Sequence, residues 1–452
     1  MNLYRKIYQS LVDWKKKDSN RTALLIEGAR RIGKSYIVEQ FARQEYRSYI
    51  LIDFSLVGED IKDVFYNDLA HPDIFFQKLS AYYGTKLYPG ESLIVFDEVQ
   101  RFPRARESIK FLMADGRYHY IETGSLISIK KNVQDIQIPS EERHLKMYPM
   151  DFEEYLIASG NEALIALIYT CFEQKKPMGQ ALHRRAMELF REYMIVGGMP
   201  QVVSSYMETR DFDIADSIKR DILNLYRDDI RKYAGRYAQK VTSIFDEIPS
   251  ALNSHERKFR LSSLDKGIRF RDYEDAFFWM EDAMIVNHCY NTREPNLGLK
   301  MNRDRVTLKC YMADTGLLIS HAFDEHNIVT EEVYKKILFD KLAVNLGMIT
   351  ENIVAQMLVA SGHKLYFYSN SSRTDSDARM EIDFLIAKNK ISNRKNISPI
   401  EVKSGKRYTL SSIKKFQKKY AMQTNTPYVL HGSDLREEEG IVYLPLYMTF
   451  CL

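Results

Sequence analysis

The sequence predicts an α/β fold with a parallel sheet in its N-terminal third, followed by a helical segment and a second α/β part. Two observations predict the first sheet. Apolar runs alternate with amphipathic helical stretches, and a glycine-rich loop lies between the first run and the first of these helices. Strands are expected at 23–26, 48–54, 93–97 and 118–123. The alternation indicates that helices connect strands running parallel to one another.

The glycine-rich loop is the strongest signal for function, because it fits the phosphate-loop pattern G-x-x-x-x-G-K-[ST]. Such glycines let backbone N–H groups and a helix N-terminus point at phosphates. Lys34 is expected to reach the β and γ phosphates, and the Ser35 hydroxyl to bind magnesium. The loop therefore predicts an ATP and Mg²⁺ site, the alternative being a glycine-rich turn ahead of a helix. Its residues are Gly28, Ala29, Arg30, Arg31, Ile32, Gly33, Lys34 and Ser35.

A second motif follows where the apolar run 92–96 ends in Asp97 and Glu98. This is the form of a buried parallel strand that carries two acids at its carboxyl end. Asp97 is expected to hold magnesium, directly or through water, and Glu98 to orient and polarise the water that attacks the γ phosphate. A strand ending in two acids is more often a solvated strand end. Its place after the phosphate loop favours the catalytic interpretation.

The fourth expected strand ends in two hydroxyl residues, Thr123 and Ser125. Either could contact the γ phosphate or the attacking water. An equally weighted alternative is a strand-ending turn held by hydroxyl hydrogen bonds.

Composition sets outer bounds on the protein. The chain has 452 residues, of which 45% are hydrophobic and 28% charged, with a net charge of +4. These values fit two or three ordinary domains, and any contact with nucleic acid must come from local clusters of charge. No apolar run reaches membrane-spanning length and the N-terminus lacks a secretory apolar core, so a cytoplasmic protein without membrane contact is expected. The cysteines show no C-x-x-C pairing and are expected to be small core residues. They are Cys171, Cys289, Cys310 and Cys451.

The phosphate loop, the acidic pair, the turn at Thr123 and segment 147–155 together resemble the AAA-type ATPases of bacteria and archaea. In that family the ATPase domain is followed by a C-terminal domain of unknown function with a restriction-endonuclease-like core. Segment 193–200 resembles the family's linker between helices, and 309–318 resembles a further family signature. The likeness covers nearly the whole chain and implies ATP hydrolysis. Because AAA-type sites often lie between subunits, a homo-oligomer is among the expected partners.

Two departures from the family pattern concern arginines. The family usually has Arg-Gln-Val-Gly-Lys-Thr in the phosphate loop, and the variant in this chain keeps the chemistry. Many relatives carry a Gly-Arg pair where this chain has Glu141, Glu142 and Arg143, which makes Arg143 a candidate arginine finger. Three arginines after the acidic pair are expected on a solvated loop and helix face, although one could serve a neighbouring site. They are Arg101, Arg104 and Arg106.

The middle of the chain is expected to be helical and then mixed. Apolar residues at helical spacing over 182–207 and 213–233 predict a helical lid and a connector. Helices over 244–283, followed by a short strand and a loop to 299, resemble a winged helix. Such modules often bind DNA and also serve as protein contacts. The basic residues that permit DNA binding there are Lys258, Arg260, Lys266, Arg269 and Arg271.

The C-terminal part shows the order α-β-β-β-α-β with acids on adjacent strands, which resembles the PD-(D/E)xK nuclease core. Asp383 and Glu401, with Glu351, could bind one or two magnesium ions that activate water. Lys403, which is not a ligand, would stabilise developing negative charge. The alternative is a nuclease-like fold that acts only as a binding scaffold. The expected elements are a helix from 351, strands at 364–369, 381–386 and 399–403, a helix near 410–421 and a strand at 427–430.

A basic block from Lys403 to Lys419 could bind DNA near that site. On its helix, four lysines share one face and apolar residues the other, so a solvated amphipathic helix is the alternative. The block consists of Lys403, Lys406, Arg407, Lys414, Lys415, Lys418 and Lys419.

The expected function is magnesium-dependent hydrolysis of ATP to ADP and phosphate, coupled to DNA or to a protein partner. Two alternatives remain, a nucleotide-switched DNA-binding or regulatory protein with little turnover and an ATP-controlled nuclease. The expected domains are an AAA-type P-loop ATPase domain over 1–160, a helical lid and connector over 161–240, a winged-helix-like segment over 241–330 and a restriction-endonuclease-like domain over 331–452.

Overall fold

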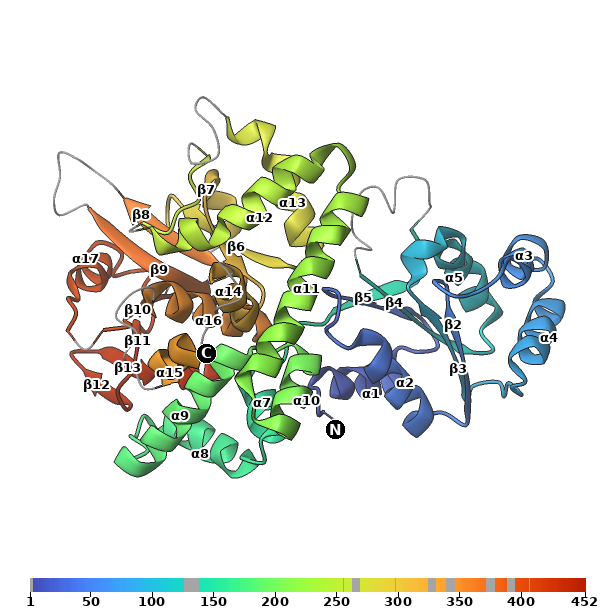
Figure 1. The fold of residues 1–452 in the computed structure, drawn as a ribbon, viewed down its shortest axis with the longest axis horizontal. Coiled ribbons are helices and arrows are strands. Elements are labelled where there is room, and N and C mark those ends of the chain that lie inside the picture. Colours follow the sequence, from blue (N-terminus) through green and yellow to red (C-terminus); the bar gives the residue numbers. More distant parts are fainter. Residues whose placement is uncertain are drawn as a thin grey trace. The chain divides into compact units, whose positions relative to one another are not determined.

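The structure, a computed structural model, consists of two compact units (Figure 1). The first unit holds Asn2–Tyr148 and Asp282–Met284, and the second holds Pro149–Glu281 and Ile285–Leu452. The structure describes residues 3–125, 138–254, 256–261, 269–296, 298–323, 331–338, 346–370, 379–387, 395–405 and 407–452.

The first unit is built on a five-stranded sheet in which all neighbouring strands run parallel. The strand order is β2-β3-β4-β1-β5, so β4 lies between β1 and β3. The predicted parallel α/β sheet is confirmed. The elements of this unit are α1 (Ile7–Lys17), β1 (Ala23–Glu27), α2 (Lys34–Glu45), β2 (Ser48–Asp53), α3 (Glu59–Asn67), α4 (Pro72–Tyr83), β3 (Ser92–Asp97), the 3-10 helix η1 (Val99–Arg101), α5 (Pro103–Asp115), β4 (His119–Gly124) and β5 (Glu142–Lys146).

The sequence does not predict β5. Its residues are mostly polar, and each of them is partly or largely exposed. Among the described strands it pairs with β1, at the edge of the sheet. An edge strand can be polar on both faces, so no apolar run marks it in the sequence.

One apolar core of the first unit lies on the face of the sheet that α3, α4 and α5 cover. Phe65 packs against Phe75 with ring centroids 5.2 Å apart and against Phe96 at 5.5 Å. Such edge-to-face aromatic pairs stabilise a core beyond simple burial. Ile94 and Phe96 of β3 point into this core. Because side chains alternate along a strand, Asp97 points to the opposite face.

The second unit combines helices with an eight-stranded mixed sheet of order β12-β13-β11-β10-β9-β8-β6-β7. The expected helical segment is present as α8 to α11. The elements are α7 (Phe152–Ala158), α8 (Glu162–Gln174), α9 (Gln180–Val196), α10 (Pro200–Thr209), α11 (Phe212–Tyr233), α12 (Ala238–Asn253), α13 (Glu274–Asp282), β6 (Val286–Thr292), β7 (Arg303–Met312), α14 (Thr315–Ala322), α15 (Glu331–Leu338), α16 (Leu346–Ala360), β8 (Tyr366–Asn370), β9 (Met380–Ala387), β10 (Ile397–Val402), α17 (Ser411–Lys419), β11 (Tyr428–His431), β12 (Arg436–Glu438) and β13 (Ile441–Pro445).

The predicted α-β-β-β-α-β order is present as α16, β8, β9, β10, α17 and β11. Strand β9 runs antiparallel to β8 and β10, whereas β10, β11 and β13 run parallel. The hairpin β6–β7, from the segment predicted to resemble a winged helix, pairs with β8 in the same sheet. The expected boundary at residue 330 therefore falls between strands of one sheet. The four-part division of the chain stays a prediction.

The cysteines and the hydropathy of the helices bear on two expectations from composition. All four cysteines are free, and Cys171, Cys289 and Cys310 are buried. In the part of the chain that the structure describes, no helix has both the length and the hydropathy needed to cross a membrane.

The two family-like segments 193–200 and 309–318 meet at a buried carboxylate. Asp314 Oδ2 accepts a hydrogen bond from the N–H of Gly198 at 2.6 Å, and its Oδ1 accepts one from Leu317 N–H at 2.9 Å. A Cβ on Gly316 would lie 2.6 Å from the carbonyl oxygen of Val196. The glycines in both segments thus permit direct backbone contact, which gives the two segments a structural role.

Replacing Gly198 with alanine tests this close contact. A Cβ there would lie 2.8 Å from the Met150 nitrogen and would overlap the Met150 carbonyl. We expect the free energy of unfolding to fall by about 1–3 kcal/mol, the usual effect of overpacking, and the melting midpoint to fall by a few degrees. Calorimetry of the full chain measures both. Gly432→Ala is the control, because its Cβ would meet nothing within 4 Å. Equal melting points for the two variants would contradict the close-contact interpretation.

Candidate functional site

The phosphate loop connects the end of β1 to the start of α2. Gly33, the residue before α2, has φ 88° and ψ 26°, a left-handed conformation that glycine adopts without steric cost. A Cβ on Gly28 would lie 2.6 Å from the carbonyl oxygen of Met147. The two glycines of the motif are therefore both needed for the path of the chain.

Lys34 lies inside the loop and is 6% exposed. Its ammonium donates hydrogen bonds to the carbonyl oxygens of Gly28 at 3.0 Å and Ala29 at 2.9 Å. Of the remaining loop residues, Arg30 is half-buried, Arg31 is exposed and Ile32 is buried. The ammonium is thus held among backbone groups at the amino end of α2, where anions bind favourably.

Sequence reasoning missed a buried arginine that braces the loop. Arg5 is 5% exposed, and its guanidinium donates to the carbonyl oxygens of Ile32 at 2.8 Å and Tyr148 at 2.6 Å. It thereby links the loop to the segment that follows β5. No local pattern signals this role, because both acceptors are backbone atoms far from Arg5 in the sequence.

Asp97 joins the loop to the neighbouring strands. The Ser35 hydroxyl donates to Asp97 Oδ1 at 2.9 Å, and the Thr123 hydroxyl donates to the same oxygen. Thr123 and the buried Ser125 lie at the end of β4, between β1 and β3. The structure brings together the hydroxyl and carboxylate oxygens predicted for magnesium, and such oxygen donors are the ligands that Mg²⁺ prefers.

Glu98 directly follows β3 in an unusual backbone conformation. Its φ of 53° and ψ of 44° are left-handed, which costs a residue with a Cβ on the order of 1 kcal/mol. Its Oε2 accepts a hydrogen bond from the Gln100 side chain at 2.5 Å. Backbone strain of this kind is often found at functional sites, where it redirects a side chain.

One of the arginines expected on a solvated face differs from expectation, whereas Arg101 is exposed as expected. Arg106 is not on a solvated face: it is 3% exposed and donates two hydrogen bonds to Glu142, at 2.9 and 2.7 Å. The sequence could not show this partner, which belongs to the unpredicted strand β5. Arg104 pairs with Glu107 at 3.0 Å. Arg143, the candidate arginine finger, forms an ion pair with Asp18.

The Arg106 pair belongs to a larger cluster of charges on β1, β4 and β5. Hydrogen bonds to Glu142 and Glu27 raise the pKa of His144 to about 9. Burial would raise the pKa of Glu142, but hydrogen bonds from His144 and Arg106 lower it to about 2. Burial holds the pKa of Glu122 well above its usual range. The cluster thus places a carboxyl group of lowered pKa beside one of raised pKa.

The acids predicted for a nuclease centre are held by basic side chains. Glu351 on α16 is fully buried and accepts hydrogen bonds from Lys309 at 2.9 Å, from Tyr311 and from Arg257. Lys309 also lies 3.8 Å from Asp383. Burial would raise the pKa of Glu351, but Lys309 and Arg257 hold it below its usual value. Burial and the charge of Glu351 raise the pKa of Asp383 to about 7.

Glu401 and Lys403 form a separate pair, with Lys403 Nζ 2.5 Å from Glu401 Oε2. Burial raises the pKa of Glu401. Within the described ranges, no three His, Cys, Asp or Glu side chains are grouped closely enough to hold a metal ion. The structure therefore does not bring Glu351, Asp383 and Glu401 together as a ligand set, and the ammonium of Lys309 lies near the first two.

The basic block is partly exposed. Lys414 pairs with Glu439 at 2.7 Å, while Lys418 and Lys419 are exposed on α17, whose apolar side chains Ile413 and Phe416 are buried. This is the amphipathic arrangement expected from the sequence. Lys406 of this block, and Lys266 of the earlier basic residues, lie outside the described residues.

Three segments of the chain match known protein families. Residues 20–156 match the family described as AAA domain. Residues 187–326 match Domain of unknown function (DUF8612), and 346–448 match Domain of unknown function (DUF4143). No curated protein matches the chain.

Two solved structures are similar to parts of the chain. PCH-2 of C. elegans is 14% identical with a TM-score of 0.26, and the match covers 46% of this chain and 60% of that one. The chain thus matches less than two thirds of the length of PCH-2. The RuvB Holliday junction branch migration motor of Thermotoga maritima is 12% identical with a TM-score of 0.30, covering 74% and 95%.

The parallel sheet, the phosphate loop and the acids at the end of β3 are the features of a P-loop NTPase fold. Most of the residues that match the AAA domain lie in this first unit, which is therefore similar to an AAA-type domain.

The charge cluster generates a prediction about pH. Because the pKa of His144 in the folded protein is about 9 and its usual value is 6.5, its stabilising contribution is complete below pH 6.5 and is lost as the pH rises through 9. We expect wild type to be more stable than His144→Gln at pH 6 and this difference to shrink by pH 9.5. Urea unfolding of both chains at several pH values measures it. A stability difference that does not change with pH would contradict the raised pKa.

Proposed function

We propose that the protein binds ATP with magnesium and hydrolyses it to ADP and phosphate. The observation that carries this proposal is the hydrogen bonding of Ser35 and Thr123 to one oxygen of Asp97, beside the loop that holds Lys34. These residues come from three neighbouring elements at the carboxyl edge of a parallel sheet. Nucleotides commonly bind at that edge.

In the proposed mechanism, Lys34 exchanges the carbonyl oxygens of Gly28 and Ala29 for β and γ phosphate oxygens. The N–H groups at the start of α2 bind the same phosphates. Ser35 and Asp97 would hold Mg²⁺, which supplies positive charge to the phosphate oxygens. The residues of the loop thus fix the nucleotide before the reaction begins.

Glu98 orients the attacking water and accepts its proton as the new oxygen–phosphorus bond forms. The bond between the γ phosphorus and the bridging oxygen breaks, and ADP leaves with that electron pair. The left-handed backbone of Glu98 marks the point where the chain leaves β3. The Thr123 hydroxyl holds Asp97 in place and lies where it could also contact the γ phosphate or the water. Ser125 stands as the second candidate for that contact.

Two substitutions separate binding from hydrolysis. Lys34→Ala should abolish ATP binding, because it removes the cation that contacts the phosphates. Glu98→Gln should still bind ATP but hydrolyse it at least about 100-fold more slowly, the usual effect of losing a catalytic base. Binding of a fluorescent ATP analogue and release of phosphate measure the two steps.

Matched controls use exposed residues of the same unit. Lys110→Ala on α5 and Glu91→Gln, which precedes β3, change the same kinds of side chain at other positions. Both should bind and hydrolyse ATP as wild type does. Normal turnover in Glu98→Gln would show that the assignment of the catalytic glutamate is wrong.

We infer that ATP hydrolysis is coupled to DNA through the basic face of α17. Lys418 and Lys419 are exposed there, and lysines that neutralise phosphates give DNA binding its dependence on salt. A protein partner is the alternative, because the same face is an ordinary amphipathic helix surface.

We expect DNA to raise the ATPase rate. We also expect the double substitution Lys418→Gln/Lys419→Gln to lower the affinity for DNA by the same factor whatever the DNA sequence. The slope of log affinity against log salt should fall by about two, because each of the two lysines would neutralise one phosphate. Fluorescence anisotropy at several salt concentrations measures the slope. The control is Lys16→Gln/Lys17→Gln, an exposed lysine pair on α1. An ATPase rate that DNA leaves unchanged would favour the protein partner or a nucleotide switch.

An ATP-controlled nuclease is the second candidate, favoured by the α-β-β-β-α-β order and the Glu401–Lys403 pair. Against it, the ammonium of Lys309 lies between two of the acids that a metal would need. The same DNA samples, examined for cut strands with magnesium or manganese, separate a nuclease from a binding scaffold.

A further inference from the structure

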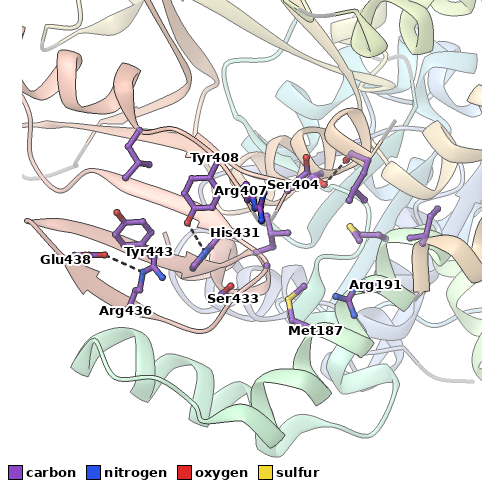
Figure 2. Close-up of a pocket in the computed structure, with 18 of the residues that line it drawn as sticks. Met187, Arg191, Ser404, Arg407, Tyr408, His431, Ser433, Arg436, Glu438 and Tyr443 are labelled. Atoms are coloured by element: carbon purple, nitrogen blue, oxygen red, sulfur yellow. Dashed lines mark hydrogen bonds and ion pairs between the residues drawn. The ribbon is translucent and has the colours of Figure 1, made fainter. Parts of the chain in front are cut away.

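The second unit contains a cavity of about 730 Å³ that the ATPase mechanism does not use (Figure 2). Loop residues that follow β10 and β11 line it, as do side chains of α9 and α17. The described residues that line it do not include Glu351, Asp383 or Glu401, so the cavity is distinct from the acids predicted for a nuclease centre. It lies where the parallel strands β10, β11 and β13 end, the edge at which α/β sheets bind ligands.

The charged side chains around the cavity are mostly basic. The lining includes four cationic side chains and two carboxylates. It therefore carries an excess of positive charge, which favours an anionic ligand. These side chains are Arg191, Arg407, Lys414, Arg436, Glu438 and Glu439.

Both carboxylates already have cationic partners. Glu439 pairs with Lys414 at 2.7 Å, and Glu438 lies 3.9 Å from Arg436. Arg407 is an exposed residue, and its guanidinium forms no hydrogen bond or ion pair with any residue in the described part of the chain. Arg407 is therefore available to a ligand without breaking an existing contact.

A buried histidine offers a second contact. His431, at the end of β11, is 2% exposed, and its Nε2 has no hydrogen-bond partner among the described residues. Its Nδ1 lies 3.2 Å from the Tyr408 hydroxyl, as Figure 2 shows. Burial lowers the pKa of His431 to about 4, so the ring is neutral at physiological pH. A buried polar atom without a partner is unfavourable unless a ligand or water satisfies it.

The Tyr408 hydroxyl can donate its proton to His431 Nδ1, and the remaining proton of the neutral imidazole then lies on Nε2. In that tautomer His431 presents an N–H donor, which suits an oxygen of an anion.

The rest of the lining is apolar and aromatic. Met187, Met194 and Leu446 contribute apolar surface, and the Tyr443 ring lies beside His431 with ring centroids 5.7 Å apart. Sites for small molecules typically measure about 300–1,000 Å³ and combine such surface with a few polar groups. The cavity thus fits a ligand that joins an anionic group to a larger planar or apolar group.

We propose that this cavity binds a free nucleoside phosphate of mononucleotide size, with its phosphate at Arg407 and His431 and its base against the apolar lining. A phosphate monoester supplies the charge and the acceptor oxygens, and a nucleoside supplies the bulk. Inorganic phosphate alone would leave most of the cavity unfilled. The site is independent of the ATP site in the first unit.

AMP is the probe, titrated by calorimetry into full-length Lys34→Ala, in which the phosphate loop cannot bind nucleotide. AMP should bind, and adenosine, which lacks the phosphate, should bind at least about tenfold more weakly. Adding Arg407→Gln should weaken AMP binding about tenfold or more, as expected for the loss of a charge-assisted hydrogen bond. The matched control is Arg305→Gln, an exposed arginine of β7 outside the cavity, which should leave AMP affinity unchanged.

Wild type saturated with a non-hydrolysable ATP analogue gives a second measurement if Lys34→Ala does not fold. Failure of AMP to bind, or equal affinity in Arg407→Gln and Arg305→Gln, would overturn the proposal. Tight binding of a 5′-phosphorylated oligonucleotide without binding of AMP would also overturn it and assign the cavity to the end of a nucleic-acid strand. Because the phosphate loop is disabled or filled in both experiments, these outcomes do not depend on whether the protein hydrolyses ATP.

Discussion

The proposed ATP site depends on one buried carboxylate oxygen, Asp97 Oδ1, which accepts hydrogen bonds from both Ser35 and Thr123. A carboxylate that is 6% exposed is unfavourable unless such donors replace water. Its donors can reach it only because β4 lies between β1 and β3. The strand order, the phosphate loop and the acidic strand end therefore constrain one another, and a change in any of them would leave Asp97 without its donors.

Buried carboxylates in the second unit are satisfied in a different way. Glu351 receives Lys309 and Arg257, so charge is neutralised by cations of the chain itself. A buried ion pair stays favourable only while both partners are present. At Asp97 the donors are neutral hydroxyls, and the negative charge remains available to a metal. A buried carboxylate thus serves the proposed metal site in one unit and fold stability in the other, according to its partners.

This difference explains how much the sequence could predict. The apolar runs located strands β1 to β4 of the first sheet, and the motif spacing located Lys34, Ser35 and Asp97, because each signal is local. The sequence did not predict strand β5, because an edge strand needs no apolar run. The roles of Arg5 and Lys309 were not predicted, because their partners, Ile32 and Glu351, lie far away in sequence. No local pattern shows which distant cation a carboxylate or a carbonyl group will contact.

The carboxyl ends of parallel strands in the two units offer anions different chemistry. In the first unit, α2 begins directly after the loop that follows β1, so backbone N–H groups and the helix dipole contribute. In the second unit, α17 begins only at Ser411, well after β10 ends at Val402. Recognition there has to come from side chains such as Arg407 and His431. Because the Arg407 guanidinium is exposed, binding at that cavity should weaken with salt more steeply than binding at the phosphate loop.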